Sequence, residues 1–346
     1  MPGSSIRSRA QGCLLGQLSG DSLGSLVEFR TAEEIAAQYP DGLRLLADGG
    51  SWSTIAGQPT DDSEMALTLA RSIVAAGGYD PEATAAAYAA WFGSGPFDSG
   101  HTTRTALRAA LAAVRGSRPV AEAARLAALP ESQANGSLMR ISPLAIAGVS
   151  SPEDVVQACA RADSALTHPH PACQDACALF VTAIRFAIQT GEPAPVVYQH
   201  TLQIAANLRA EQTVMGALEA AQRVGPVEYS RQQGWVLIAF QNAFFQLLHA
   251  GGMEAGVVDT VRRGGDTDTN GAIAGALLGS VWGLESIPRQ WMECVLSCRP
   301  LSGRPGVHQP RPEVYWPVDA LELAGRLLET GLSATRSHAQ TTPPTH

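Results

Sequence analysis

Glycine recurs every four residues in two stripes near opposite ends of the chain: Gly12, Gly16, Gly20 and Gly24, and then Gly271, Gly275, Gly279 and Gly283. Residues four apart share one face of an α-helix, so each stripe predicts a helix face without side chains. Glycine inside a helix costs about 0.5–1 kcal/mol relative to alanine, so eight such positions need a packing reason. We therefore expect two helices that cross at the centre of the fold with their backbones in close approach.

The rest of the composition favours an all-α domain. Hydrophobic residues make up 45% of the 346 residues and charged residues 16%, and no Val/Ile-rich segment alternates as a strand would. We expect one compact multi-helix domain over residues 9–331, with a flexible N-terminus (1–8) and a disordered tail (332–346). Helices are predicted at about 6–29, 65–76, 81–92, 103–115, 119–128, 172–189, 196–223 (one or two helices), 236–249 and 318–331, and another helix is predicted to begin at 287–291. Residues 31–59 are predicted mainly as loop.

An acidic stretch, Gly264–Gly271, stands directly before the second glycine-striped helix. Asp266, Asp268 and Thr269 offer hard oxygen donors with no His or Cys nearby, which favours Mg²⁺, Mn²⁺ or Ca²⁺ over zinc. A calcium EF-hand is excluded, because its twelfth position holds Leu277 instead of Glu. The alternative is an ordinary loop and helix cap, for which Asp and Thr are also typical.

A second cluster of the same kind, Thr60, Asp61 and Asp62, precedes an apolar-periodic helix. Helix capping explains one acid there easily and two neighbouring acids less well. Two hard-oxygen clusters, each at a helix start, could together hold two divalent ions.

Further polar residues stand at loops and helix starts, where they could meet a substrate. Asp98 and His101 lie in a glycine-rich loop, and His168 lies in a proline-restricted segment. Asn135–Ser137 exposes backbone N–H groups of the kind that grip phosphate. As alternatives, Asp98 is a turn residue, and His101 and His168 are cap neighbours.

Charge and apolar patterning exclude several classes of protein. A net charge of −8 argues against non-specific nucleic-acid binding. The first residues lack the apolar core of a signal peptide, and no apolar run reaches the ~18 residues expected of a membrane helix. We expect a cytoplasmic protein without a membrane partner. Its six cysteines are interpreted as reduced, mostly buried thiols, because two C-x₃-C pairs fall in helical sequence.

From about Gly12 to Trp291 the chain resembles the ADP-ribosylglycohydrolase family. Six motifs, in the family's order, carry the resemblance. They are G-x₃-G-D-S-L-G at 16–24 followed by Glu28, T-D-D-S-E-M at 60–65, F-D-S-G-H-T-T at 97–103, N-G-S-L-M-R-I-S-P at 135–143, T-H-P at 167–169 and G-G-D-T-D-T-N-G-A-I-A-G-A-L-L-G at 264–279. The resemblance implies an all-α domain with a central cleft that holds two Mg²⁺ or Mn²⁺ ions.

The resemblance also implies a role for particular residues. It assigns the two ions to Thr60, Asp61, Asp62, Asp266, Asp268 and Thr269. Glu28 and Asp98 match acids near the reacting ribose, and we expect them to serve the reaction rather than to bind metal. Substrate contacts are implied at Gly100, His101, Asn135, Gly136, Ser137 and His168. His101 stands where the family commonly has Asn, which bears on substrate preference.

The activity implied is hydrolysis of the glycosidic bond between ADP-ribose and a protein side chain, with arginine the first expectation. Serine-linked ADP-ribose and O-acetyl-ADP-ribose are alternative substrates. Other classes remain open at this stage: a catalytically silent binding relative, a dinuclear phosphohydrolase, and an immunity protein that blocks an ADP-ribosyltransferase toxin by contact. Whether Glu28 or Asp98 is the general base is not decided by the sequence.

Overall fold

The computed structural model describes residues 4–332, and this part of the chain folds into helices without any β-strand. The predicted all-α class is therefore confirmed. The α-helices are α1 (Ile6–Gly24), α2 (Ala32–Gln38), α3 (Asp61–Ala76), α4 (Pro81–Gly93), α5 (His101–Arg115), α6 (Val120–Ala127), α7 (Ser142–Ala147), α8 (Glu153–Ser164), α9 (Pro171–Thr190), α10 (Ala194–Leu208), α11 (Gln212–Ala221), α12 (Val236–His249), α13 (Met253–Arg262), α14 (Thr267–Trp282), α15 (Arg289–Ser297) and α16 (Ala320–Thr330). Four short 3₁₀ helices join them: η1 (Asn135–Ser137), η2 (Gly148–Ser150), η3 (Leu284–Ser286) and η4 (Glu313–Tyr315).

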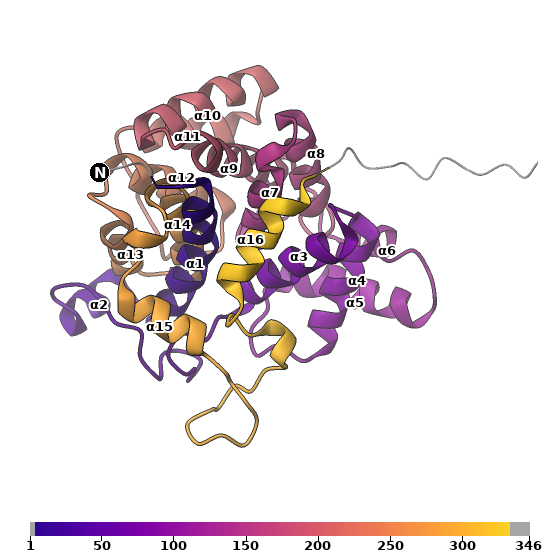
Figure 1. Cartoon of the computed structure of the whole chain (residues 1–346), viewed down its shortest axis with the longest axis horizontal. Helices are drawn as coiled ribbons and strands as arrows, with labels where there is room; N and C mark the ends of the chain where they lie inside the picture. The colour runs from indigo at the N-terminus through magenta and orange to yellow at the C-terminus, as the bar shows by residue number, and fades with distance from the viewer. Residues whose placement is uncertain (1–3, 333–346) are drawn as a thin grey trace, which may run out of the picture.

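Helices α1 and α14 lie side by side at the centre of the molecule (Figure 1). Their glycines face each other in antiparallel register, with Gly12 opposite Gly279, Gly16 opposite Gly275 and Gly20 opposite Gly271. A Cβ atom on Gly16 would lie 2.4 Å from the carbonyl oxygen of Gly275, and one on Gly20 would lie 2.0 Å from that of Gly271. No side chain fits between these backbones. The predicted meeting of the two stripes is correct, and it runs along most of both helices.

The other helices pack around this central pair. Helices α12 and α13 pack on α14, α16 packs on α1, and α9 contacts both central helices. Helices α3, α4, α5 and α6 follow one another through successive contacts and lie together on one side of the molecule (Figure 1). The core between them is built from Leu, Ile, Val, Ala and aromatic residues with almost no exposed surface.

Helix α9 corrects one expectation from the sequence. It is 20 residues long with a mean hydropathy of 1.3 over its most apolar window, so length and composition alone would allow a membrane span. However, 83% of that window is buried inside the domain, as in the core helix of a globular protein.

Several predicted boundaries differ from the observed ones. Helix α1 ends at Gly24 instead of near residue 29, and Thr267 at the start of α14 donates from its Oγ1 to the Gly24 carbonyl at this helix end. The segment 31–59 contains α2, whose N-cap Thr31 and Glu34 form a capping box. Residues 196–223 form two helices, since Arg209 takes a left-handed conformation between them. Helices α7, α8 and α13 were not predicted.

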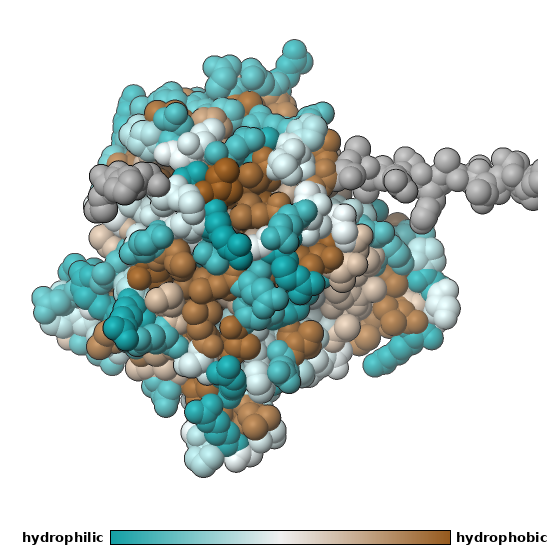
Figure 2. All heavy atoms as spheres, viewed as in Figure 1, coloured by the Kyte–Doolittle hydropathy of each residue, from teal (hydrophilic) through white to brown (hydrophobic). Residues whose placement is uncertain are grey.

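The predicted flexible ends fall largely outside the described residues, because residues 1–3 and 333–346 are not described. Figure 2 shows the surface on one face, where hydrophobic residues appear in patches over α1, α15 and α16 and hydrophilic side chains interrupt them. Scattered apolar side chains of this kind are normal on a protein surface.

Candidate active site

A cavity of about 330 Å³ brings together residues from seven separate parts of the sequence. Of the fourteen predicted site residues, twelve line it: Glu28, Asp61, Asp62, Asp98, Gly100, His101, Asn135, Gly136, His168, Asp266, Asp268 and Thr269. The two that do not line it are Thr60 and Ser137, which are fully buried beside it. Six carboxylates therefore share one cavity, which we call the acidic cleft.

The first acidic cluster stands at the start of α3, with Thr60 as the N-cap residue. Its conformation is fixed by Asp21 on α1, whose carboxylate accepts from the backbone N–H groups of Thr60 and Ser63, each over 3.1 Å. The Thr60 hydroxyl lies 3.0 Å from Asp21 Oδ1 and 2.9 Å from Asp62 Oδ2. Asp21 thus caps the helix that presents Asp61 and Asp62 to the cleft.

The second acidic cluster stands at the start of α14, with Asp266 at the N-cap. Gly264 and Gly265 precede it with φ of +75° and +76°, a conformation that only glycine adopts readily. Asp268 accepts from the backbone N–H of Thr269 over 2.9 Å. Ligand oxygens of Glu28, Asp266 and Asp268 all lie within 4.8 Å of one another, close enough to share a metal ion. Glu28, which the sequence analysis kept apart from the metal ligands, therefore lies next to two of them, Asp266 and Asp268.

Burial and mutual repulsion raise the pKa values of these carboxyl groups. The pKa of Glu28 rises to about 8, through burial and then the charge of Asp98. Burial followed by the charge of Asp266 raises the pKa of Asp98 to about 6. Asp61 and Asp268 have pKa values well above the usual range, again chiefly through burial. Such crowding is unfavourable unless protons or cations neutralise it.

A second part of the cleft carries N–H donors instead of acids. Asn135 donates from its side-chain Nδ2 to Asp266 Oδ2 over 2.7 Å, which joins η1 to the start of α14. Gly136 lies against the His168 ring, and a Cβ atom there would come within 2.9 Å of His168 Cε1. Ser137 instead points away, and its hydroxyl accepts from Ser164 over 2.9 Å.

The protonation of His168 follows from its buried neighbours. Arg140 Nη1 donates to Thr167 Oγ1 over 2.9 Å, and the Thr167 hydroxyl can donate in turn to His168 Nδ1 over 2.7 Å. Nδ1 then accepts, so Nε2 carries the hydrogen, and Nε2 is buried without a partner among the described residues. Burial, followed by the charge of Arg140, lowers the pKa of His168 to about 3. His168 therefore offers a neutral N–H donor to the cleft.

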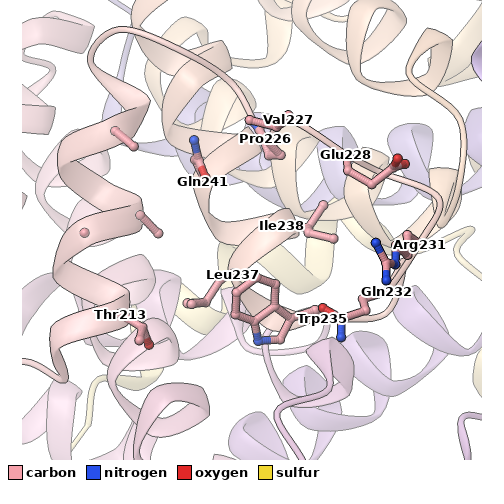
Figure 3. A pocket seen from close by; sticks show the side chains of 13 residues that line it. Thr213, Pro226, Val227, Glu228, Arg231, Gln232, Trp235, Leu237, Ile238 and Gln241 are labelled. Carbon is pink, nitrogen blue, oxygen red and sulfur yellow. The ribbon is translucent and has the colours of Figure 1, made fainter.

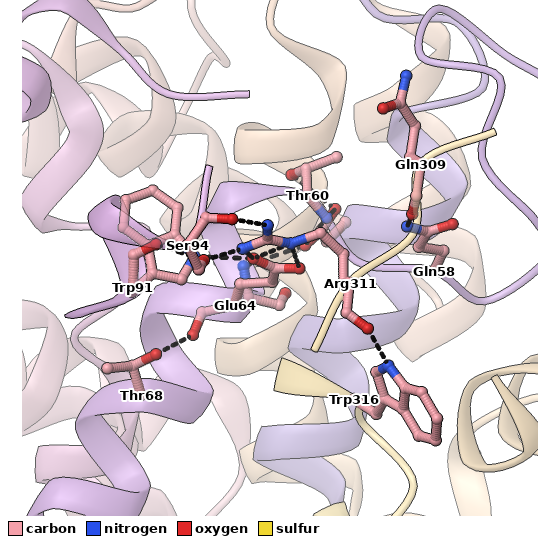
Figure 4. Close-up of polar contacts among 11 residues, drawn as sticks. Gln58, Thr60, Glu64, Thr68, Trp91, Ser94, Gln309, Arg311 and Trp316 are labelled. Atoms are coloured by element: carbon pink, nitrogen blue, oxygen red, sulfur yellow. Dashed lines mark hydrogen bonds and ion pairs between the residues drawn. The ribbon is translucent and has the colours of Figure 1, made fainter. Parts of the chain in front are cut away.

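A proline-rich arm, residues 299–317, contacts helix α3, which carries Asp61 and Asp62 of the cleft (Figure 4). Arg311 in this arm forms a two-pronged ion pair with Glu64 of α3, with Nε–Oε1 and Nη2–Oε2 distances of 2.8 Å. The same guanidinium donates to Ser94 Oγ over 2.9 Å, at the start of the loop that carries Asp98. Gln309 Nε2 donates to the carbonyl of Trp52 over 3.0 Å.

A second cavity, with a volume of about 550 Å³, lies between α11 and α12 (Figure 3). Apolar groups such as Val227, Leu237 and Ile238 line it, and the only charged side chains there are Glu228 and Arg231. It adjoins the acidic cleft through the segment 232–235, which lines a shallow hollow between them. It contains none of the predicted site residues, so the smaller acidic cleft is the better candidate for chemistry.

Sequence reasoning missed several residues that shape the cleft: Phe29, Trp52, Arg140, Thr167 and Arg311. Arg140 and Thr167 lie inside quoted motifs, so their position in those motifs was an available signal. Phe29 was placed in the helix predicted at 6–29, and Trp52 and Arg311 stand in irregular segments, where no periodicity marks them.

The fold is all-α, and its cleft combines six carboxylates with N–H donors. Comparisons with known proteins place a chain of this kind in a family of hydrolases. The model of the ADP-ribosylglycohydrolase family matches residues 2–329, and the chain belongs to this family. It is a hydrolase that removes ADP-ribose from its acceptor.

Curated relatives span most of the chain. ADP-ribosyl-[dinitrogen reductase] glycohydrolase of Rhodospirillum rubrum is 32% identical over 84% of this chain and 92% of its own length. ADP-ribosylarginine hydrolase Tri1 of Pseudomonas putida is 27% identical over 83% of this chain and 74% of its own length. A solved structure described as an ADP-ribosylglycohydrolase-related protein complex has the same fold, with a TM-score of 0.74, 24% identity and coverage of 95% of this chain and 99% of its own.

Proposed function

We propose that this hydrolase removes ADP-ribose from arginine side chains of modified proteins, with two Mg²⁺ or Mn²⁺ ions in the acidic cleft. The observation that carries the proposal is the meeting of six carboxylates in one cavity. Cleavage at the anomeric carbon of ribose develops positive charge, which carboxylates stabilise. An arginine leaving group is itself a cation, and this cleft would attract it. The name of the Pseudomonas relative supports the same acceptor.

The donors of the cleft fit divalent ions. All candidate ligands are oxygen atoms, and Asp62 Oδ1 is buried without a hydrogen-bond partner in residues 4–332. Ligand oxygens of Glu28, Asp266 and Asp268 are already close enough to surround one ion. We assign one ion chiefly to the cluster at 60–62 and one to the cluster at 266–269, with Asp268 between them. Such ions would hold the ribose hydroxyls and a water molecule in place.

The remaining side chains divide the chemical work. Asp98 is the proposed general base, because it lines the cleft from the loop between α4 and α5, outside both clusters of metal ligands. Glu28, which is buried beside Asp266 and Asp268, stabilises the positive charge at the anomeric carbon. Asn135, the backbone of Gly136 and the N–H of His168 take the diphosphate and ribose oxygens. Orientation by these donors contributes to the rate as well as to affinity.

Product analysis tests the proposal. The purified protein with Mn²⁺ is incubated separately with an ADP-ribosylarginine peptide, an ADP-ribosylserine peptide and O-acetyl-ADP-ribose, and the products are identified by mass spectrometry. We expect ADP-ribose and unmodified arginine peptide, with arginine the preferred acceptor. Release of AMP would indicate a phosphohydrolase instead, and cleavage of the serine peptide alone would contradict the assigned acceptor. Asp268→Asn serves as the inactive control.

Two variants separate the roles of the acids. Asp98→Asn should retain Mn²⁺ and ADP-ribose binding, while kcat falls on the order of 10²–10⁴-fold, as expected when a general base is lost. Glu28→Gln should lower kcat as well. Its bound Mn²⁺, measured by calorimetry, tells whether Glu28 also holds an ion. Full activity of Asp98→Asn would exclude it as the base.

A further inference from the structure

Three aromatic rings stand together beside the two acids proposed for the reaction. The ring centroids of Phe29 and Trp52 are 6.4 Å apart in an edge-to-face arrangement, and those of Trp52 and Phe97 are 5.9 Å apart. Each ring is next to an acid of the cleft, either as its neighbour in the chain or through a hydrogen bond. Phe29 follows Glu28 in the chain, Phe97 precedes Asp98, and Trp52 Nε1 donates to Glu28 Oε2 over 2.5 Å.

Phe29 holds its position at a conformational cost. Its φ is +66°, a region that a bulky side chain rarely adopts. Two backbone hydrogen bonds fix this geometry, from Phe29 N to Gly265 O over 2.8 Å and from Gly265 N to Arg30 O over 2.9 Å. The ring gains little burial in return, because Phe29 is 56% exposed and lines the acidic cleft. Strained residues that gain nothing in packing are typical of ligand sites.

The chemistry around these rings suits a flat cation. The faces of aromatic rings attract cations, and a guanidinium group also stacks on them through its own plane. Glu28 and Asp98 are carboxyl groups next to the rings, and a cation bound there favours their ionised forms. A different part of the lining, with Asn135 and His168, offers N–H donors that suit the anionic diphosphate. The cleft therefore has separate surfaces for the cationic and the anionic ends of an ADP-ribosylated arginine.

We propose that Phe29, the one of the three rings that lines the cleft, forms the acceptor subsite and stacks the guanidinium group of the modified arginine next to Glu28 and Asp98, while Trp52 and Phe97 extend the row of rings beside it. This assignment rests on the proposed function and names the side chains that select arginine. An uncharged acceptor such as serine gains no cation–π attraction from the rings. Phe29 is the specificity-determining residue, because its exposed ring is the one held over the cleft.

The test uses the full chain loaded with Mn²⁺ and ADP-ribosyl-agmatine, a small guanidine-linked substrate. Two measurements are compared: kcat/KM for this substrate, and the Kd for free ADP-ribose by calorimetry. Phe29→Leu removes the ring and keeps an apolar side chain, and Phe29→Tyr keeps a ring as the matched control. We expect kcat/KM of Phe29→Leu to fall roughly 3- to 30-fold, the range of a cation–π contact. Phe29→Tyr should stay within about threefold of the wild type, and the Kd for ADP-ribose should not change in either variant.

Three outcomes are separable. An unchanged kcat/KM for Phe29→Leu would overturn the acceptor subsite while leaving the proposed function intact. Equal losses in kcat/KM and in ADP-ribose affinity would show that the ring contacts the ADP-ribose part, which also overturns the assignment. If the wild-type protein did not cleave ADP-ribosyl-agmatine at all, the proposed arginine specificity itself would fail.

Discussion

Arg311 and Glu64 form a buried ion pair that ties the C-terminal arm to the helix bearing Asp61 and Asp62. Their side chains are 3% and 2% exposed, and two donor–acceptor distances are 2.8 Å (Figure 4). Trp91 Nε1 donates to the same carboxylate over 2.7 Å. The arm therefore sets the position of α3 and of the loop that begins at Ser94, and both carry acids of the cleft.

Removal of one partner of this pair should destabilise the protein strongly. Arg311→Met leaves the Glu64 carboxylate buried without its cation, which typically costs about 3–5 kcal/mol. The matched control is Arg44→Met, because Arg44 pairs with Glu254 at the same 2.8 Å but both side chains are exposed. Such surface pairs contribute about 0–1 kcal/mol. Urea unfolding measures both, and similar losses in the two variants would contradict a special role for the arm.

The glycines of α1 and α14 face each other, so a single methyl group added to one of them should lower the stability of the protein strongly. Gly16→Ala and Gly275→Ala place a Cβ atom 2.4 Å and 2.1 Å from a carbonyl oxygen of the facing helix, so the helices must separate. We expect each to lose more than the 1–3 kcal/mol typical of overpacking. Gly216→Ala on α11 is the control, because its Cβ meets no atom within 4 Å. There, alanine should stabilise by about 0.5–1 kcal/mol. Thermal unfolding distinguishes these results.

Part of this architecture could be predicted from local patterns in the sequence. The glycine stripes predicted the central helix pair, and Asp and Thr clusters at helix starts marked both halves of the acidic cleft. Contacts between distant loops left no such pattern. Nothing near Arg311 shows that it pairs with Glu64, 247 residues away. The early end of α1 was also not predicted, since the Gly24 carbonyl there accepts a hydrogen bond from Thr267, which is 243 residues away in the sequence.

The crowded carboxyl groups predict how the stability of the metal-free protein depends on pH. In the folded state the pKa of Asp98 is about 6, that of Asp21 about 7 and that of Glu28 about 8. These values exceed the ~4 of the unfolded chain, so the folded state holds protons that the unfolded state has released. Stability from these groups is present below about pH 4 and is lost as the pH rises through 6 to 8. We expect the melting temperature in chelator to fall from pH 6 to pH 8. A rise over this interval would contradict the raised pKa values.

Because His168 is neutral, we expect its contribution to substrate binding not to depend on pH between 6 and 8. His168 lines the cleft and its Nε2 has no partner among the described residues, so His168→Leu should weaken ADP-ribose binding about tenfold or more, since a hydrogen bond to a charged group is worth about 1.5–3 kcal/mol. The loss should be the same at pH 6 and pH 8, because the pKa of His168 is about 3. Thr201→Val is a control, because that hydroxyl is buried in α10 and donates to the carbonyl of Val197. Calorimetry measures both variants, and unchanged affinity in His168→Leu would remove it from the substrate contacts.

The proposed metal site holds two divalent ions between Thr60–Asp62 and Asp266–Thr269. Anomalous scattering from crystals soaked in Mn²⁺ tests it most directly, because each ion gives its own peak. We expect two peaks inside the acidic cleft, about 3.5–4 Å apart as in two-metal sites generally, one nearer Asp61 and one nearer Asp266. A single peak, or no peak within reach of these carboxylates, would contradict the claim.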